Sequence, residues 1–154
     1  MTRTNPNEAA ATLAQRIAIE ELNAAFAHCL DHAAYDELGE LFSTDAHYAS
    51  GLRTMGGRDS IVQSFVTRAQ MGGPRTTRHM YSGLRLRFDG ASLARGQSVW
   101  ISYACNAAVP VDEVTPFVVA DFEDIYVLEE DGQWRIQERV IRPVFRNPKA
   151  APAA

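Results

Sequence analysis

The hydrophobic pattern of this chain changes its period near Thr76. Before that point, apolar residues recur at the spacing of helices. After it they alternate with polar residues, as Leu84, Leu86 and Phe88 do around two arginines. The later strands are expected over 76–88, 93–106, 117–128 and 134–144. Helices followed by an antiparallel meander favour an α+β fold, with N-terminal helices packed on the concave face of a curved mixed or antiparallel β-sheet.

Three helices are expected in the first part of the chain. The first has a start signal at Asn5-Pro6-Asn7-Glu8 and runs toward Leu30. Its apolar stripe comprises Leu13, Ile17, Leu22, Phe26 and Cys29. The other two helices are expected over 34–42 and from Asp59 to Ala69. Between these two, residues 46–50 are expected to form a strand and residues 51–57 a turn-rich link.

His79 is out of phase with the alternation of Leu84, Leu86 and Phe88. His79 and this apolar set can all face buried layers only if the register of the strand shifts near Ser82-Gly83. A glycine at such a position is typical of a β-bulge, which inserts one extra residue into a strand.

Composition places the chain among ordinary globular domains. Its 154 residues suffice for one domain, expected over 9–146, with a mobile N-terminal tail (1–8) and a disordered C-terminal tail (147–154). The net charge of −4 gives no reason to expect nucleic acid or a membrane as partner. Cys29 and Cys105 lie in apolar runs and are expected to be reduced thiols, which together with the lack of a signal-type segment favours a cytoplasmic location.

Asp31 and His79 are the candidate catalytic pair. Asp31 closes the long amphipathic helix, and His79 follows the polar run Arg75-Thr76-Thr77-Arg78. If the fold brings them together, Asp31 would orient the imidazole and stabilise its charged form. Each also has a simpler interpretation: Asp31 could cap the second helix, and His79 could bond to a backbone carbonyl.

Strand parity indicates which side chains would surround a pocket under the sheet. The candidate substrate-binding residues are Phe26, Tyr48, Trp100, Ser102, Ala104, Val118, Ala120 and Phe122. The opposite parity places Val99, Ile101, Tyr103 and Val119 on the outer face. Because this apolar surface needs cover, a homo-oligomer is expected.

Five stretches of the chain, in this order, resemble the landmarks of SnoaL-like proteins in the nuclear-transport-factor-2-like superfamily. They are Leu30–Leu38, Leu41–Ala46, Gly57–Ile61, Arg78–Met80 and Asp131–Ile136. The resemblance covers roughly Leu13 to Phe145 and implies a cone-shaped α+β barrel. It is strongest toward the branch that holds scytalone dehydratase and hexachlorocyclohexane dehydrochlorinase, whose histidine removes a proton and is oriented by an aspartate.

The resemblance implies a cofactor-independent enzyme acting on a small apolar cyclic substrate by elimination, dehydration or isomerisation. Asp31 and His79 fall on the positions of that dyad, and Arg139 on the dehydrochlorinase's catalytic arginine. The resemblance also slightly favours a trimer over a dimer as the assembly. This chain has Phe26 near where the dehydrochlorinase has a lysine, and Trp100 to Asn106 lacks the second histidine of scytalone dehydratase. The leaving group and substrate are therefore expected to differ.

Other functions stay open at this stage. The same fold could serve as a non-catalytic binding or interaction module, or as a β-type small subunit of a ring-hydroxylating dioxygenase. Arg139 could simply pair with surface carboxylates. His28 and His32 have a spacing that can hold a metal, but the buried stripe turns His28 away from the pocket, so no metal and no cofactor are expected. Cys29 is expected to be an inert thiol.

Overall fold

The computed structural model describes residues 6–71 and 73–150. The first of its three α-helices is also the longest. The helical elements are α1 (Pro6–Asp31), α2 (Tyr35–Leu38), the 3₁₀ helix η1 (Gly39–Leu41), α3 (Arg58–Met71) and the 3₁₀ helix η2 (Pro148–Ala150). None of the helices in these ranges has both the length and the apolar character needed to span a membrane.

The strands form one six-stranded mixed sheet with the order β2-β1-β6-β5-β4-β3. They are β1 (Phe42–Ser50), β2 (Arg53–Gly56), β3 (Thr76–Phe88), β4 (Leu93–Cys105), β5 (Pro116–Leu128) and β6 (Trp134–Arg146). β1 pairs with β6 in parallel, and the remaining neighbours are antiparallel. The sheet keeps two edges, β2 and β3, so the cone is open and not a closed barrel.

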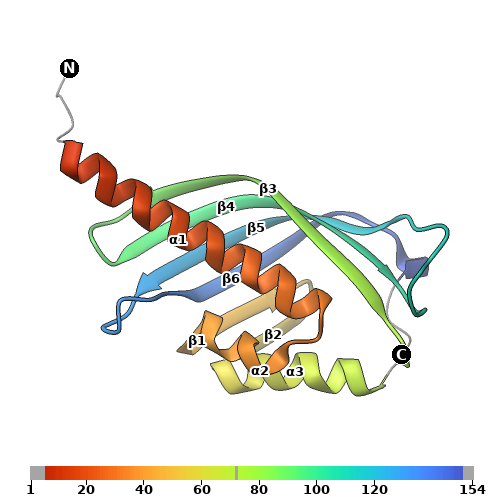
Figure 1. Ribbon diagram of the computed structural model, residues 1–154. Helices are drawn as coiled ribbons and strands as arrows, with labels where there is room; N and C mark the ends of the chain where they lie inside the picture. Colours follow the sequence, from red (N-terminus) through yellow and green to blue (C-terminus); the bar gives the residue numbers. More distant parts are fainter. Residues whose placement is uncertain (1–5, 72, 151–154) are drawn as a thin grey trace.

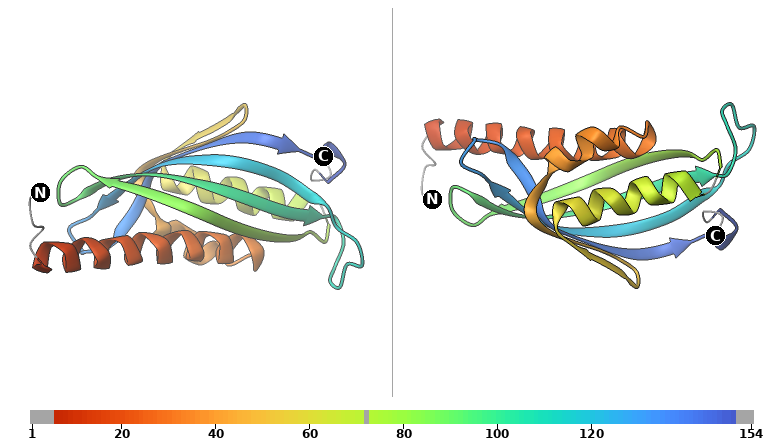
Figure 2. Two further views of the ribbon diagram at one scale, coloured as in Figure 1. Left: turned by 90° about the horizontal axis from the view of Figure 1, so that it is seen from above. Right: turned by 90° about the horizontal axis from the view of Figure 1, so that it is seen from below.

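All three helices lie on the concave side of the sheet (Figures 1 and 2). α1 runs across the long strands and contacts β3, while α3 packs against β1 and β2. This arrangement confirms the predicted α+β cone with its helices on the inner face. It also brings the end of α1 beside the first half of β3.

The predicted register shift in β3 is present. Pairing with β4 is interrupted between Ser82 and Arg85, and Gly83 has a φ of 67°. Before the bulge His79 and Tyr81 face inward, whereas after it Leu84 is buried. One strand therefore points both the histidine and the later apolar residues toward the concave side.

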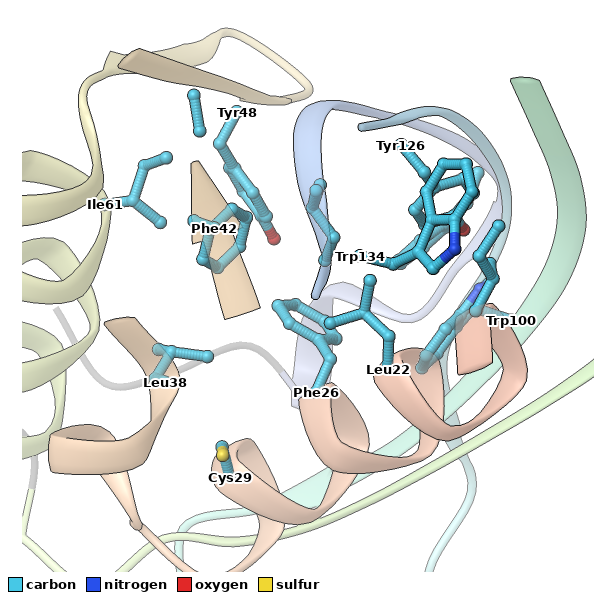
Figure 3. Close-up of a cluster of buried hydrophobic side chains, with 14 of the residues drawn as sticks. Leu22, Phe26, Cys29, Leu38, Phe42, Tyr48, Ile61, Trp100, Tyr126 and Trp134 are labelled. Carbon is cyan, nitrogen blue, oxygen red and sulfur yellow. The ribbon is translucent and has the colours of Figure 1, made fainter. Parts of the chain in front are cut away.

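Aromatic side chains from α1, β1 and β4 meet under the sheet (Figure 3). The Trp100 ring stacks between Tyr81 and Phe122, with centroids 4.8 and 4.6 Å away. Phe26 of α1 meets Trp100 edge-on at 5.9 Å. These rings fix the helix against the sheet, and such pairs add to the stabilisation from burial alone.

The first half of the predicted stripe on α1 is wrong. Leu13 and Ile17 are 57% and 52% exposed, whereas Ile19, Leu22 and Phe26 are buried. Successive residues turn by about 100° around a helix, so Ile17 lies on nearly the opposite side from Ile19. The side of α1 that faces the sheet passes through Arg16, whose guanidinium donates to the Leu84 carbonyl at 2.7 Å.

Several predicted boundaries differ from the structure. The link at 51–57 contains the strand β2, which pairs with β1 from His47–Gly56 to Ser50–Arg53. The expected second helix is split into α2 and η1, and β1 already begins at Phe42. The expected tails lie partly outside the described residues. Within them, α1 begins at Pro6 and η2 covers Pro148–Ala150.

Candidate active site

A cavity of about 390 Å³ lies between the helices and the concave face of the sheet. This volume lies in the range of small-molecule sites. The candidate wall residues from the sequence all line it: Phe26, Tyr48, Trp100, Ser102, Ala104, Val118, Ala120 and Phe122. His79 also lines the cavity. The inward parity assigned to β4 and β5 is therefore correct.

Asp31 and His79 are in direct contact. The His79 Nδ1 lies 2.6 Å from Asp31 Oδ1, and the backbone N–H of His79 donates to Asp31 Oδ2 at 2.8 Å. The side chains are 7% and 15% exposed for Asp31 and His79, respectively. Because Nδ1 is held by the carboxylate, Nε2 is the ring nitrogen left for a molecule in the cavity.

Neither simpler interpretation matches these contacts. α2 begins after Ala34 and has no side-chain cap, so Asp31 does not cap it. The His79 ring bonds to a carboxylate and not to a backbone carbonyl. Asp31 thus holds His79 by its ring nitrogen and by its backbone N–H, and it lies behind the histidine as seen from the cavity.

Thr77 is a part of this site that the sequence did not single out. Its hydroxyl donates to Asp31 Oδ1 at 3.0 Å. The signal was available, because Thr77 lies two residues before His79 and so shares its face of β3. Together with the ring and the backbone N–H of His79, it gives the carboxylate three hydrogen-bond partners.

These donors control the charge of Asp31. Burial raises the pKa of Asp31, but the hydrogen bonds from His79 and Thr77 outweigh it and hold the pKa below its ordinary value. The carboxylate is therefore ionised throughout the neutral range, as an orienting group for an imidazole must be.

The lowered pKa of Asp31 predicts a pH-dependent contribution to stability. A carboxyl whose pKa is lower in the folded state binds fewer protons there than when unfolded, so its contribution is complete above its ordinary pKa of about 3.9 and is lost as pH falls. We expect the stability gap between wild type and Asp31→Asn to narrow as the pH falls below about 4. Urea unfolding at several pH values measures this gap, and a gap that widens toward acid pH would contradict the assignment.

Arg139 does not lie where the sequence suggested. It is fully buried at 0% exposure and is absent from the cavity lining. Its Nε and Nη2 donate to the two carboxylate oxygens of Asp124 at 2.9 Å each. The guanidinium lies beneath the cavity walls, 4.3 Å from the Phe26 ring centroid and 5.1 Å from that of Phe122. The alternative of a surface ion pair is also wrong, because the partner is buried Asp124.

Asp124 and Arg139 belong to a buried polar network. Tyr126 donates to Asp124 Oδ2 at 2.6 Å, and Asn23 of α1 donates to the Tyr126 hydroxyl at 2.9 Å. Burial alone would lower the pKa of Arg139, but the charge and hydrogen bonds of Asp124 hold it above the ordinary value. Among the described residues, Arg139 Nη1 is the one buried side-chain polar atom without a hydrogen-bond partner.

The other candidate groups, the His28–His32 pair and Cys29, do not line the cavity. His28 and His32 are exposed, with ring centroids 4.5 Å apart. Within 6–71 and 73–150, no group of three or more histidine, cysteine or acidic side chains is arranged to hold a metal ion. Burial raises the pKa of Cys29, which keeps this thiol protonated and unreactive.

The sequence matches the family model of the SnoaL-like domain over residues 11–140. The chain therefore belongs to the SnoaL-like family, within the nuclear-transport-factor-2-like superfamily. No curated protein matches the sequence.

Three solved structures illustrate the range of proteins that share this fold. A candidate scytalone dehydratase from Novosphingobium aromaticivorans is 21% identical, with a TM-score of 0.79 over 95% of each chain. The β subunit of a candidate aromatic-ring-hydroxylating dioxygenase from the same organism is 17% identical, with a TM-score of 0.74 over 94% of this chain and 99% of that one. ActVI-ORFA from Streptomyces coelicolor is 13% identical, with a TM-score of 0.74 over 85% and 98%. At these identities the likeness shows the fold.

Proposed function

We propose that this protein is a cofactor-independent enzyme that removes a proton from a small cyclic substrate through the Asp31–His79 dyad. The observation that carries the proposal is the 2.6 Å contact between Asp31 Oδ1 and His79 Nδ1 at the wall of a cavity. The likeness to a candidate scytalone dehydratase supports elimination of water as the outcome. Isomerisation and cyclisation begin with the same proton transfer.

The first step would transfer a proton from a carbon next to a carbonyl group to His79 Nε2. The C–H electron pair then forms the enolate, and the imidazolium is stabilised by ionised Asp31. In a dehydration, the enolate expels the β-hydroxyl group, which leaves as water with the proton returned from Nε2. In an isomerisation, the same proton returns to a different carbon.

Tyr48 is a candidate donor for the enolate oxygen. Its side chain lines the cavity, and its hydroxyl has no hydrogen bond to another described residue. Burial raises the pKa of Tyr48, so the hydroxyl keeps its proton and can donate it in a hydrogen bond. Arg139 would act from beneath the wall, its charge largely balanced by Asp124, as a positioning residue for Phe26 and Phe122.

The dyad favours catalysis over the two other candidate functions. A binding module or a β-type subunit needs a stable fold and a contact surface, but neither requires a histidine oriented by a buried carboxylate. An aromatic wall of Phe26, Trp100 and Phe122 around such a base also limits water access, which strengthens the electrostatic coupling.

Proton exchange in D₂O tests the proposal without knowledge of the final product. With cyclic β-hydroxy ketones as substrates, we expect the protein to incorporate deuterium next to the carbonyl group faster than buffer alone, as measured by proton NMR. Exchange catalysed equally well by His79→Ala would contradict the mechanism. Tight binding with no exchange and no turnover across such a panel would favour the binding module.

The outer face of the sheet supports a proposal on assembly. Met80, Ile101, Val119 and Phe145 are register partners in successive pairs and form an apolar row across β3, β4, β5 and β6. Met80 and Phe145 are 51% and 69% exposed, and nearby Val99 is 44% exposed. Apolar patches of this kind are usually covered, and a second copy of the chain would cover it symmetrically.

We therefore expect light scattering at micromolar concentration to give the mass of a homo-oligomer. A trimer is slightly favoured over a dimer. Phe145→Lys should shift the mass toward the monomer, because it places a charge in the apolar row. Leu52→Lys is the matched control, since Leu52 is exposed but lies outside this row. A monomeric wild type would contradict the proposal.

A further inference from the structure

The cavity mouth carries positive charge without a counterion. Four arginines line the cavity: Arg53, Arg68, Arg75 and Arg146. No aspartate or glutamate lines it among the described residues. The chain as a whole has a net charge of −4, so this local excess runs against its overall composition.

The four side chains converge from separate parts of the fold. Arg53 comes from β2, Arg68 from α3 and Arg146 from the end of β6, while Arg75 immediately precedes β3. Arg68 follows Ile61 and Phe65 of α3 at helical spacing, and Arg146 is the register partner of the cavity residue Val118.

Several arginines elsewhere on the surface are neutralised by carboxylates. Arg87 of β3, Arg95 of β4 and Arg142 of β6 each form such an ion pair. Within the described part of the chain, Arg53, Arg68 and Arg146 form no ion pair or side-chain hydrogen bond. Arg75 bonds neutral partners, through Nη1 to the Asn106 side chain at 2.7 Å and through Nη2 to the Ala150 carbonyl at 3.4 Å.

Two of the guanidinium groups are held by aromatic rings. Arg68 lies over Phe65, 4.9 Å from the ring centroid, and Arg75 lies over Phe117 at 5.7 Å. Desolvation lowers the pKa of both, and the charge of Arg68 lowers that of Arg75 further. Like charges that are partly desolvated and oriented by aromatic contacts would gain from a bound anion.

We propose that the substrate carries an oxyanion, a carboxylate or a phosphate, which Arg68 and Arg75 bind at the cavity mouth while its ring lies against Trp100 and Phe122. Arg53 and Arg146 add to the positive potential there. Guanidinium groups match both oxyanions through paired N–H donors. The inference rests on the proposed function, since it names the substrate class of the same site, and it adds a charged end to the apolar molecule expected from the sequence.

Binding of 2-naphthoate and its neutral analogue 2-naphthamide tests the proposal. Calorimetry at pH 8 should show that wild type binds the carboxylate about 10- to 100-fold more tightly than the amide, the range expected for charged hydrogen bonds. Arg68→Met/Arg75→Met should lose this preference, while the affinity for 2-naphthamide changes little. 2-Naphthyl phosphate, measured in parallel, distinguishes the two oxyanions: the tighter of the two charged probes identifies the group that the mouth accepts.

Arg85→Met is the matched control, because Arg85 is exposed, lies outside this cavity and should not affect the preference. His79→Ala should also keep the preference, so a failed mechanism and a failed anion site give different results. Equal affinity of wild type for naphthoate and naphthamide would overturn the proposal. So would a preference that survives in the double variant, or no binding of 2-naphthoate at millimolar concentration.

Discussion

His79→Ala is expected to lower kcat by about 10²–10⁴-fold, the contribution typical of a positioned general base. Nε2 is the proton acceptor in the proposed reaction, and no other histidine lines the cavity among the described residues. Ligand affinity should change far less, because the aromatic walls determine it. The measurement is steady-state turnover of a cyclic β-hydroxy ketone that wild type processes.

Asp31→Asn should lower kcat within the same range. The amide keeps the shape of the carboxylate but cannot stabilise the imidazolium, and it can present an N–H where Nδ1 needs an acceptor. His47→Ala is the control, because His47 is exposed on β1 and does not line the cavity. Full turnover in His79→Ala would show that the mechanism is wrong.

A binding module would give the reverse pattern. Trp100→Ala or Tyr48→Ala would then weaken ligand binding, whereas His79→Ala would have no effect because there is no turnover to lose. Measuring both affinity and turnover for the same variants therefore distinguishes the two functions.

The largest loss of stability is expected from Asp124→Leu, about 3–5 kcal/mol in the free energy of unfolding. The substitution leaves the charge of Arg139 buried without its counterion and also removes the nearer acceptor of the Tyr126 hydroxyl. Urea unfolding measures the effect.

Asp124→Leu/Arg139→Met should recover much of that loss, because two apolar side chains replace a pair whose burial has a large desolvation cost. Glu123→Gln provides the control on the same two strands. Glu123 pairs with Arg142 at 2.9 Å on the exposed outer face, where such a pair contributes little to stability. An Asp124→Leu variant as stable as Glu123→Gln would contradict the importance of the buried network.

The inner face of the sheet could be predicted from sequence because strand parity is a local rule. Once Trp100 is assigned inward, Ser102 and Ala104 follow, and a glycine between His79 and Leu84 was enough to place the bulge. The strand β2 escaped prediction for the opposite reason. Arg53-Thr54-Met55-Gly56 has no alternating pattern, and it becomes a strand through pairing with β1.

The burial of the Arg139 side chain also could not be predicted from the sequence. Its burial depends on Asn23 and Asp124, which come from distant elements and look like ordinary polar residues in their own segments. A charged side chain is normally exposed unless it is paired, and the pairing exists only in three dimensions. The mouth arginines were missed because each is unremarkable alone and only the cavity brings them together.

Strand β3 is an open edge of the sheet, and such edges expose backbone groups on which strands of other chains can add and aggregate. Asp31 covers one of these groups, the N–H of His79, and the Arg78 and Arg16 side chains cover the carbonyls of Thr77 and Leu84. The carboxylate that contacts the imidazole thus also occupies a backbone donor to which a strand of another chain could bond. A chain evolving a new reaction in this cavity could not discard Asp31 without also risking its solubility.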